Sequence, residues 1–99
     1  MAKTKAQIIK EVDTHINKSL PYSSWYCGIA TDAKKRLFED HNVPPKNHYW
    51  IYSECENDTI AREIEDHFLK NGCKGGDGGG SKTTVYVYAY KIESWVTKE

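Results

Sequence analysis

Apolar residues recur every three or four positions in the first part of the chain. They fall at Ile8, Ile9, Val12 and Ile16. Such spacing places them along one face of a helix. Thr4 and Gln7 have the spacing of a capping box, which indicates where this helix begins. The pattern therefore predicts a helix over residues 5–18 that ends before Pro21.

Three later segments are rich in aromatic and β-branched residues, which favour extended strands. These segments are residues 25–30, 48–52 and 83–92. Residues 83–92 alternate and are dominated by Val and Tyr, which is typical of a strand with two different faces. In the first segment, Gly28 indicates that another group approaches the backbone closely.

Helical spacing returns in residues 32–41 and in residues 58–70. Thr31 or Asp32 can cap the first of these helices, because their side-chain oxygens accept from free backbone N–H groups. Gly72 marks the end of the second helix. We therefore predict two further helices, one after the first predicted strand and one after the second.

Glu65 stands out because it falls on the apolar face of the helix over residues 58–70. With Ala61 at zero on a helical wheel, Glu65 lies at about 40°, between Ala61 and Leu69. A carboxylate that faces inward needs an ion pair, hydrogen bonds, a proton or a metal, since burial of a bare charge is costly. Glu65 is therefore a candidate site residue, and a structural ion pair with Arg36 is the alternative.

The order of these segments predicts one small α/β domain. Its 99 residues suffice for a single modest core. We expect a three-stranded sheet with flanking helices, in the order α-β-α-β-α-β. The domain then consists of an N-terminal helix region (residues 1–20), a core (25–92) and a short tail (93–99).

Charge and hydropathy narrow the classes of function. The chain has 14 basic and 14 acidic residues, which argues against a protein that coats nucleic acid by bulk charge. Lys34, Lys35 and Arg36 still form a small cationic cluster. No apolar run reaches membrane-spanning length, and the N-terminal residues do not resemble a signal peptide. We therefore expect a cytoplasmic protein with no membrane partner.

The sequence holds three cysteines, Cys27, Cys55 and Cys73. Their number is odd and no two of them have metal-ligand spacing, so we expect free thiols in a reducing compartment. A zinc site that adds His41, His48 or His67 has no supporting motif.

A glycine-rich loop is predicted over residues 72–81, where six of the ten residues are glycine. Its spacing differs from that of a phosphate-binding P-loop, and it leads into a strand and not into a helix. The backbone amides of Gly75–Gly80 form either an anion-binding nest or a plain connector.

The residues that start at Tyr26 read Tyr-Cys-Gly-Ile-Ala-Thr-Asp-Ala-Lys-Lys-Arg-Leu. This segment resembles the YIG half of the GIY-YIG nuclease family, in which a strand ends in Tyr-x-Gly and a capped helix carries an arginine. Arg36 follows Tyr26 by ten residues, the usual family spacing. His41 resembles the end of that helix, and the helix with Glu65 resembles the segment that carries the family's metal-binding glutamate. The resemblance covers residues 25–91.

Two features depart from the family pattern. No Gly-Ile-Tyr strand precedes Trp25, and a helix is predicted in its place. The tyrosine of that strand is therefore missing, or it is supplied by Tyr22, Tyr88 or Tyr90. Many family members also carry an asparagine beyond the glutamate helix, where this chain has Asp77 in its glycine loop.

The resemblance implies hydrolysis of DNA phosphodiester bonds with one divalent metal. Glu65 would hold Mg²⁺ or Mn²⁺, and Arg36 would stabilise the charge on the phosphate oxygens. Tyr26, assisted by His41, would orient or deprotonate the attacking water. The residues expected to contact the nucleic acid are Gly28, Lys34 and Lys35.

The same residues leave alternatives open. Tyr26 also suits a core position in a strand, and His41 on an apolar helix face also suits a buried core histidine. The domain is then a catalytically inactive module that binds nucleic acid or another protein. A partner protein would also supply specificity to a nuclease, because a domain of this size has little surface left for it.

Overall fold

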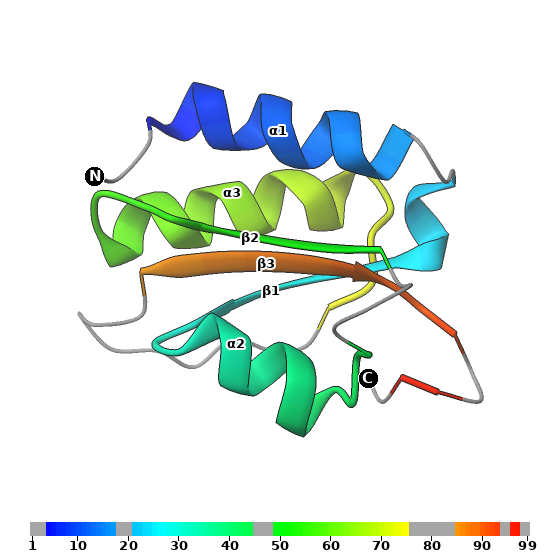
Figure 1. Cartoon of the computed structure of the whole chain (residues 1–99). Coiled ribbons are helices and arrows are strands. Elements are labelled where there is room, and N and C mark those ends of the chain that lie inside the picture. The colour runs from blue at the N-terminus through cyan, green and yellow to red at the C-terminus, as the bar shows by residue number, and fades with distance from the viewer. Residues whose placement is uncertain (1–3, 18–20, 45–48, 76–84, 94–95, 98–99) are drawn as a thin grey trace.

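The computed structural model describes residues 4–17, 21–44, 49–75, 85–93 and 96–97 (Figure 1). Along the chain they form α1 (Lys5–Asn17), the 3₁₀ turn η1 (Tyr22–Ser24), β1 (Trp25–Ala30), α2 (Ala33–Lys35), the π-helix η2 (Arg36–Asp40), β2 (Trp50–Glu54), α3 (Asp58–Lys70) and β3 (Tyr86–Lys91). Helices α1 and α3 cover one face of the sheet, and α2 covers the other (Figure 1). The expectation of a small α/β domain with a three-stranded sheet and flanking helices is confirmed.

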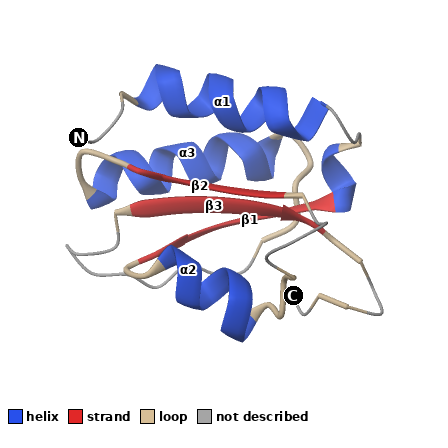
Figure 2. Cartoon of the chain, viewed as in Figure 1, coloured by secondary structure: helices blue, strands red, loops and turns tan. Residues whose placement is uncertain are grey.

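The strands of the described residues form one antiparallel sheet in the order β1-β3-β2 (Figure 2). The last strand in the sequence is therefore the central strand in space. Tyr88 lies opposite Gly28 of β1 and opposite Tyr52 of β2. Because side chains alternate along a strand, Tyr86, Tyr88 and Tyr90 all project from the same face of β3.

Each face of the sheet buries its own core. The core on the side of α1 and α3 consists of Ile8, Val12, Ile16, Trp25, Cys27, Ile29, Cys55, Ala61, Ile64, Phe68, Cys73, Val87 and Ala89. The core on the side of α2 consists of Ala30, Ala33, Leu37, Val43, Tyr88 and Tyr90. Partly buried rings surround this second core: Tyr26, Phe38, Trp50, Tyr52 and Tyr86. The α2 face is therefore the aromatic face of the sheet.

Local signals set the ends of the long helices. The Thr4 N–H donates to Gln7 Oε1 at 3.0 Å and the Gln7 N–H donates to Thr4 Oγ1 at 3.2 Å, which confirms the capping box of α1. Helix α3 has the predicted bounds. Asn57 Oδ1 accepts from the Ile60 N–H at its start, and Gly72 takes a φ of 116° just beyond its end.

The helix predicted over residues 32–41 differs from a regular α-helix. After Lys35 it continues as the π-helix η2, in which the His41 N–H donates to the Arg36 carbonyl at 2.9 Å. A π-helix holds more residues per turn than an α-helix, and short π segments often occur at functional sites. The wider turn brings His41 to a buried position against the sheet.

The second and third strands differ in length from the prediction. The predicted strand 48–52 is found as Trp50–Glu54, because the ladder with β3 extends to the pair of Glu54 and Tyr86. The predicted strand 83–92 is found as Tyr86–Lys91. His48, Thr83 and Thr84 lie outside the described residues.

The segment that follows α3 returns to the outer edge of β1. The Cys27 N–H donates to the Lys74 carbonyl at 2.9 Å, and the Lys74 N–H donates to the Trp25 carbonyl at 2.8 Å. This pairing holds the end of α3 close to β1. None of the described helices combines the length and the apolar character that a membrane crossing requires.

Candidate active site

Tyr88 of the central strand leans across Gly28 of β1. A Cβ atom built on Gly28 would lie 2.6 Å from the Tyr88 hydroxyl oxygen and 2.7 Å from its Cζ atom. Both distances are far shorter than a van der Waals contact, so only glycine leaves room for the phenol. The close approach predicted at Gly28 is therefore found, and the approaching group is the Tyr88 side chain.

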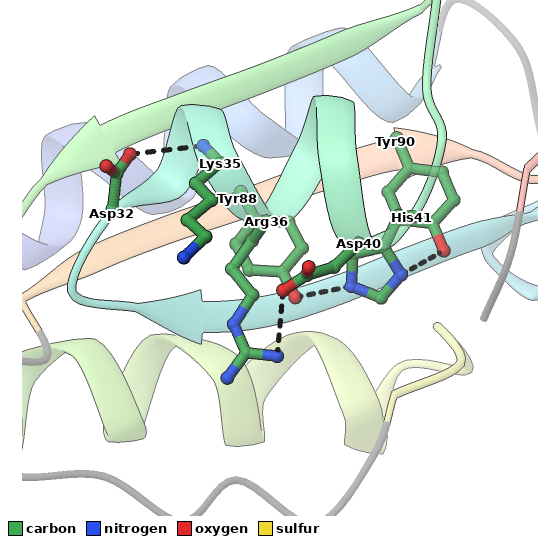
Figure 3. A network of polar contacts seen from close by, with 7 residues as sticks. All are labelled: Asp32, Lys35, Arg36, Asp40, His41, Tyr88 and Tyr90. Atoms are coloured by element: carbon green, nitrogen blue, oxygen red, sulfur yellow. Dashed lines mark hydrogen bonds and ion pairs between the residues drawn. The ribbon is translucent and has the colours of Figure 1, made fainter.

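His41, just after η2, connects two tyrosines of β3 (Figure 3). Its Nε2 atom lies 2.8 Å from the Tyr88 hydroxyl and its Nδ1 atom lies 3.0 Å from the Tyr90 hydroxyl. The residue is only 6% exposed. A neutral imidazole has one N–H and one bare nitrogen, so it donates to one tyrosine and accepts from the other. His41 can therefore exchange a proton with Tyr88 while Tyr90 holds the second nitrogen.

Tyr26 of β1 packs against the rings of His41 and Tyr90. Its ring centroid lies 4.7 Å from that of His41 and 5.3 Å from that of Tyr90. The Tyr26 and Tyr88 rings are nearly parallel, at 17°, with centroids 6.4 Å apart. We call these four side chains the Tyr–His cluster: Tyr26, His41, Tyr88 and Tyr90. Tyr26 is half-buried, so it is both a packed aromatic residue and part of the candidate site.

Arg36, the first residue of η2, keeps its guanidinium in contact with solvent. Its side chain is 54% exposed, and Nη1 lies 3.5 Å from Asp40 Oδ2. In Figure 3 the Arg36 side chain crosses β1 in the direction of α3, with Asp40 and Tyr88 nearby. An exposed ion pair at this i,i+4 spacing contributes only about 0.3–0.5 kcal/mol. A phosphate can therefore displace Asp40 at little cost.

Glu65 lies on α3, on the opposite side of the sheet from η2. It is half-buried, and burial raises the pKa of its carboxyl, while Arg62 lowers this pKa and Asp66 raises it. The ion pair considered between Glu65 and Arg36 is not among those of the described residues, where Arg36 pairs with Asp40. Glu65 takes part in none of the ion pairs found among the described residues.

The pKa of the Tyr88 hydroxyl depends on burial and on charged groups from several segments of the chain. Burial raises the pKa of Tyr88 most, negative charge on Tyr26 raises it further, and the Arg36 guanidinium lowers it. Negative charges on Cys27 and Glu65 raise it by smaller amounts. Charges from both sides of the sheet, on Arg36 and on Glu65, therefore act on the Tyr88 phenol.

Tyr22, one of the three tyrosines considered for the missing family tyrosine, lies elsewhere. Its hydroxyl donates to the Asp13 carboxylate of α1, and this bond, together with burial, raises the pKa of Tyr22 to about 12. The Tyr22 ring packs on the core beside α1 and α3. Tyr88 and Tyr90 remain as candidates for the missing family tyrosine, and of these two only Tyr88 lies over Gly28. The alternation of tyrosines along β3 is the sequence signal that places both on this face.

Lys34 and Lys35 are exposed at the start of α2. The Lys35 N–H donates to Asp32 Oδ1 at 3.1 Å, which is the cap predicted for this helix. The structure therefore brings Tyr26 and His41 against Tyr88 and leaves the two lysines on the adjoining surface, while Glu65 lies on α3, which with α1 covers the other face of the sheet (Figure 1). Asp40, the partner of Arg36, was not among the predicted site residues.

The three cysteines, Cys27, Cys55 and Cys73, are buried free thiols. Burial raises the pKa of each, to about 11 for Cys55 and Cys73, so they stay neutral and belong to the core. In the described part of the chain, no three His, Cys, Asp or Glu side chains form a group that could hold a metal. Residues 76–80 of the glycine-rich loop, Asp77 among them, lie outside the described residues, so the anion nest and the plain connector both stay predictions.

Comparisons with known proteins do not identify a relative. No protein-family model, no curated protein and no solved structure matches the chain. The functional interpretation therefore depends on the residues and on their geometry.

Proposed function

We propose that this chain is a metal-dependent endonuclease that hydrolyses DNA phosphodiester bonds at the Tyr–His cluster. One observation supports the proposal: His41 is hydrogen-bonded to the Tyr88 hydroxyl, Tyr26 packs on both rings, and the charges of Arg36 and Glu65 act on the same hydroxyl. These four residues are the catalytic residues that the family resemblance implies. They come from three segments of the chain: Tyr26 lies on β1, Arg36 and His41 lie at the start and just after the end of η2, and Glu65 lies on α3.

We also propose a GIY-YIG-like arrangement of the sheet. β3 lies antiparallel beside β1, as the family's first strand lies beside its Tyr-x-Gly strand. Tyr88 then supplies the tyrosine of the absent Gly-Ile-Tyr strand. In this arrangement the missing strand is provided by the last described strand of the chain, which accounts for the lack of such a motif before Trp25.

The carboxylate of Glu65 fits a single Mg²⁺ or Mn²⁺ ion. Mg²⁺ binds carboxylate oxygens and keeps several waters, so one protein ligand can suffice beside a substrate phosphate. Burial disfavours the ionised form of Glu65, and a cation would compensate its charge. When bound, the ion would polarise the phosphate and stabilise the leaving oxygen.

Arg36 would bind the non-bridging oxygens of the phosphate. Its guanidinium is planar and always charged, and it offers parallel N–H donors. The side chain is 54% exposed, so it can turn from Asp40 to a ligand. Negative charge on the phosphate oxygens grows in the transition state, and Arg36 would therefore contribute most at that point.

Tyr88 and His41 would take the proton of the attacking water. Because its pKa is raised, Tyr88 stays a neutral phenol near neutral pH. The water transfers a proton to the Tyr88 hydroxyl oxygen, and the Tyr88 proton passes to His41 Nε2 as the new P–O bond forms. The bond to the leaving oxygen breaks, and that oxygen takes a proton from solvent. Tyr26 packs on the imidazole and holds it in place.

A second function is favoured by the pairing of these groups within the protein. Both ring nitrogens of His41 are hydrogen-bonded, and Arg36 is paired with Asp40. Groups that already have partners suit a catalytically inactive module that binds nucleic acid or a partner protein. Metal-dependent cleavage separates this module from the endonuclease.

The test uses plasmid, single-stranded and branched DNA with Mg²⁺ or Mn²⁺. The native protein is compared with Glu65→Gln and with Glu63→Gln, a matched control on the same helix whose side chain is 49% exposed. We expect cleavage by the native protein and by the control, and a loss of about a hundredfold or more in Glu65→Gln. Equal rates for all three proteins, or no cleavage of any substrate, would contradict the proposal.

A further inference from the structure

A hollow opens on the α2 face of the sheet, close to the Tyr–His cluster. Its volume is about 500 Å³. The turn into α2 forms one wall and two strand tyrosines form the other: Thr31, Asp32, Ala33, Lys34, Tyr52 and Tyr86. We call it the Tyr52–Tyr86 pocket. Its size is within the range of small-molecule sites, and its walls combine aromatic rings with a few polar groups.

Neighbouring rings hold the aromatic wall in place. The rings of Tyr52 and Tyr86 meet edge to face, with centroids 6.2 Å apart and an angle of 69°. Trp50 stacks on Tyr52 at 6.0 Å and 5°, and Phe38 of η2 meets Trp50 edge-on at 5.0 Å. All four rings are partly exposed. The wall is therefore a pre-formed platform on which a flat ligand can stack.

The pocket and the Tyr–His cluster share the central strand. Tyr52 lies opposite Tyr88 in the ladder, and Tyr86 precedes Tyr88 by two residues on the same face. Two residues along a strand span about 6.6 Å, and adjacent strands lie about 4.8 Å apart. A DNA strand that places a phosphate between Arg36 and Tyr88 therefore brings a neighbouring nucleotide to the pocket.

We propose that the Tyr52–Tyr86 pocket binds one unpaired nucleobase of the strand that is cleaved, so that the substrate is single-stranded or frayed at the site. Aromatic side chains stack on the face of any base. In a duplex each base is stacked and paired, and it enters a pocket only when it leaves the helix. Lys34 at the rim suits the adjoining phosphate, and Asp32 suits an amino group of the base.

This inference rests on the proposed function for the position of the phosphate, but it is tested without cleavage. Binding is measured in EDTA with a short single-stranded DNA that contains one 2-aminopurine, a fluorescent adenine analogue. The same strand annealed to its complement is the comparison. We expect the native protein to bind the single strand about tenfold more tightly than the duplex and to quench the 2-aminopurine through stacking.

Two variants remove the stacking surface. Tyr52→Leu and Tyr86→Leu are each expected to weaken single-strand binding about tenfold and to reduce the quenching, with no change for the duplex. Tyr52→Phe keeps the ring, so it is expected to bind like the native protein even if a leucine variant does not fold. Tyr49→Leu is the matched control, because Tyr49 is 48% exposed and contacts His15 and Trp25 on the other face.

The outcomes separate the pocket from the nuclease. Equal affinity for single strand and duplex, or a loss in Tyr49→Leu as large as in Tyr52→Leu, would overturn the pocket. Binding that depends on Tyr52 without any cleavage in Mg²⁺ would support the pocket and remove the nuclease. Cleavage in Mg²⁺ by the native protein, together with unchanged single-strand binding by Tyr52→Leu, would support the nuclease and overturn the pocket. No binding of any oligonucleotide would contradict both and would favour a protein partner.

Discussion

Replacement of Gly28 by alanine adds one methyl group at the point where β1 and Tyr88 meet. The added carbon would lie 2.6 Å from the Tyr88 hydroxyl oxygen, 2.7 Å from Cζ and 3.1 Å from Cε2. These atoms belong to a rigid ring whose hydroxyl is hydrogen-bonded to His41. The ring cannot move aside without loss of that bond. The substitution therefore tests the position of Tyr88, on which the candidate site depends.

The expected magnitude combines two costs and one gain. An extra methyl group in a packed site costs about 1–3 kcal/mol. Loss of the buried hydrogen bond between Tyr88 and His41 costs about 1 kcal/mol more. Alanine gains about 0.5–1 kcal/mol over glycine inside a strand, because glycine loses more freedom on folding. We therefore expect Gly28→Ala to lower the free energy of unfolding by about 1–3.5 kcal/mol.

Denaturant unfolding followed by circular dichroism measures this cost in two backgrounds. In Tyr88→Leu the phenol is absent, so the further change Gly28→Ala is expected to be neutral or to stabilise by about 0.5 kcal/mol. A cost below about 0.5 kcal/mol in the native background would refute the close approach of Tyr88 to Gly28. An equal cost in both backgrounds would refute it as well.

Four further predictions concern Glu65, Tyr90 and Tyr22. Burial raises the pKa of Glu65 in the folded protein, so the protonated Glu65 carboxyl stabilises the fold below pH 4.5, and this stabilisation is lost as the pH rises through the folded pKa. Glu65→Gln cannot titrate, so in EDTA its free energy of unfolding is expected to depend less on pH than that of the native protein. Mg²⁺ is expected to raise the Tm of the native protein and not that of this variant, and an equal rise in both would contradict a metal at Glu65. Tyr90→Phe removes the partner of His41 Nδ1 and is expected to cost about 1–3 kcal/mol in denaturant unfolding, whereas native stability would contradict this bond. Tyr22→Phe removes the hydrogen bond to Asp13. Because the folded pKa of Tyr22 is about 12, the native protein is expected to exceed this variant in free energy of unfolding by the full amount below pH 10.0 and by less and less toward pH 12. Cleavage at neutral pH is expected to be the same for both proteins.

The long helices and the first strand were predictable because local signals mark their ends. Helix α3 lies between a side-chain cap at Asn57 and a left-handed glycine at Gly72, and both features are visible in the sequence. The π-helix was not predictable in this way. His41, at the end of this helix, bonds to residues 47 and 49 positions away in the chain. No local pattern contains such contacts.

The candidate site was predictable only in part, for similar reasons. The helical wheel identified Glu65, and the strand glycine indicated a close approach at Gly28. The identity of the approaching group, Tyr88, depends on the strand order and register, which the pattern does not specify. For Arg36 the prediction considered a distant partner, although Asp40 stands four residues further on the same helix.

Single-turnover cleavage of DNA in Mg²⁺ by Glu65→Gln, Tyr88→Phe and the double variant decides whether these two residues act at one centre. If they do, each single variant slows cleavage by about a hundredfold or more, and the double variant is no slower than the slower single one. Losses that multiply in the double variant, or a Tyr88→Phe protein that cleaves as fast as the native one, would contradict a common centre around the Tyr88 hydroxyl.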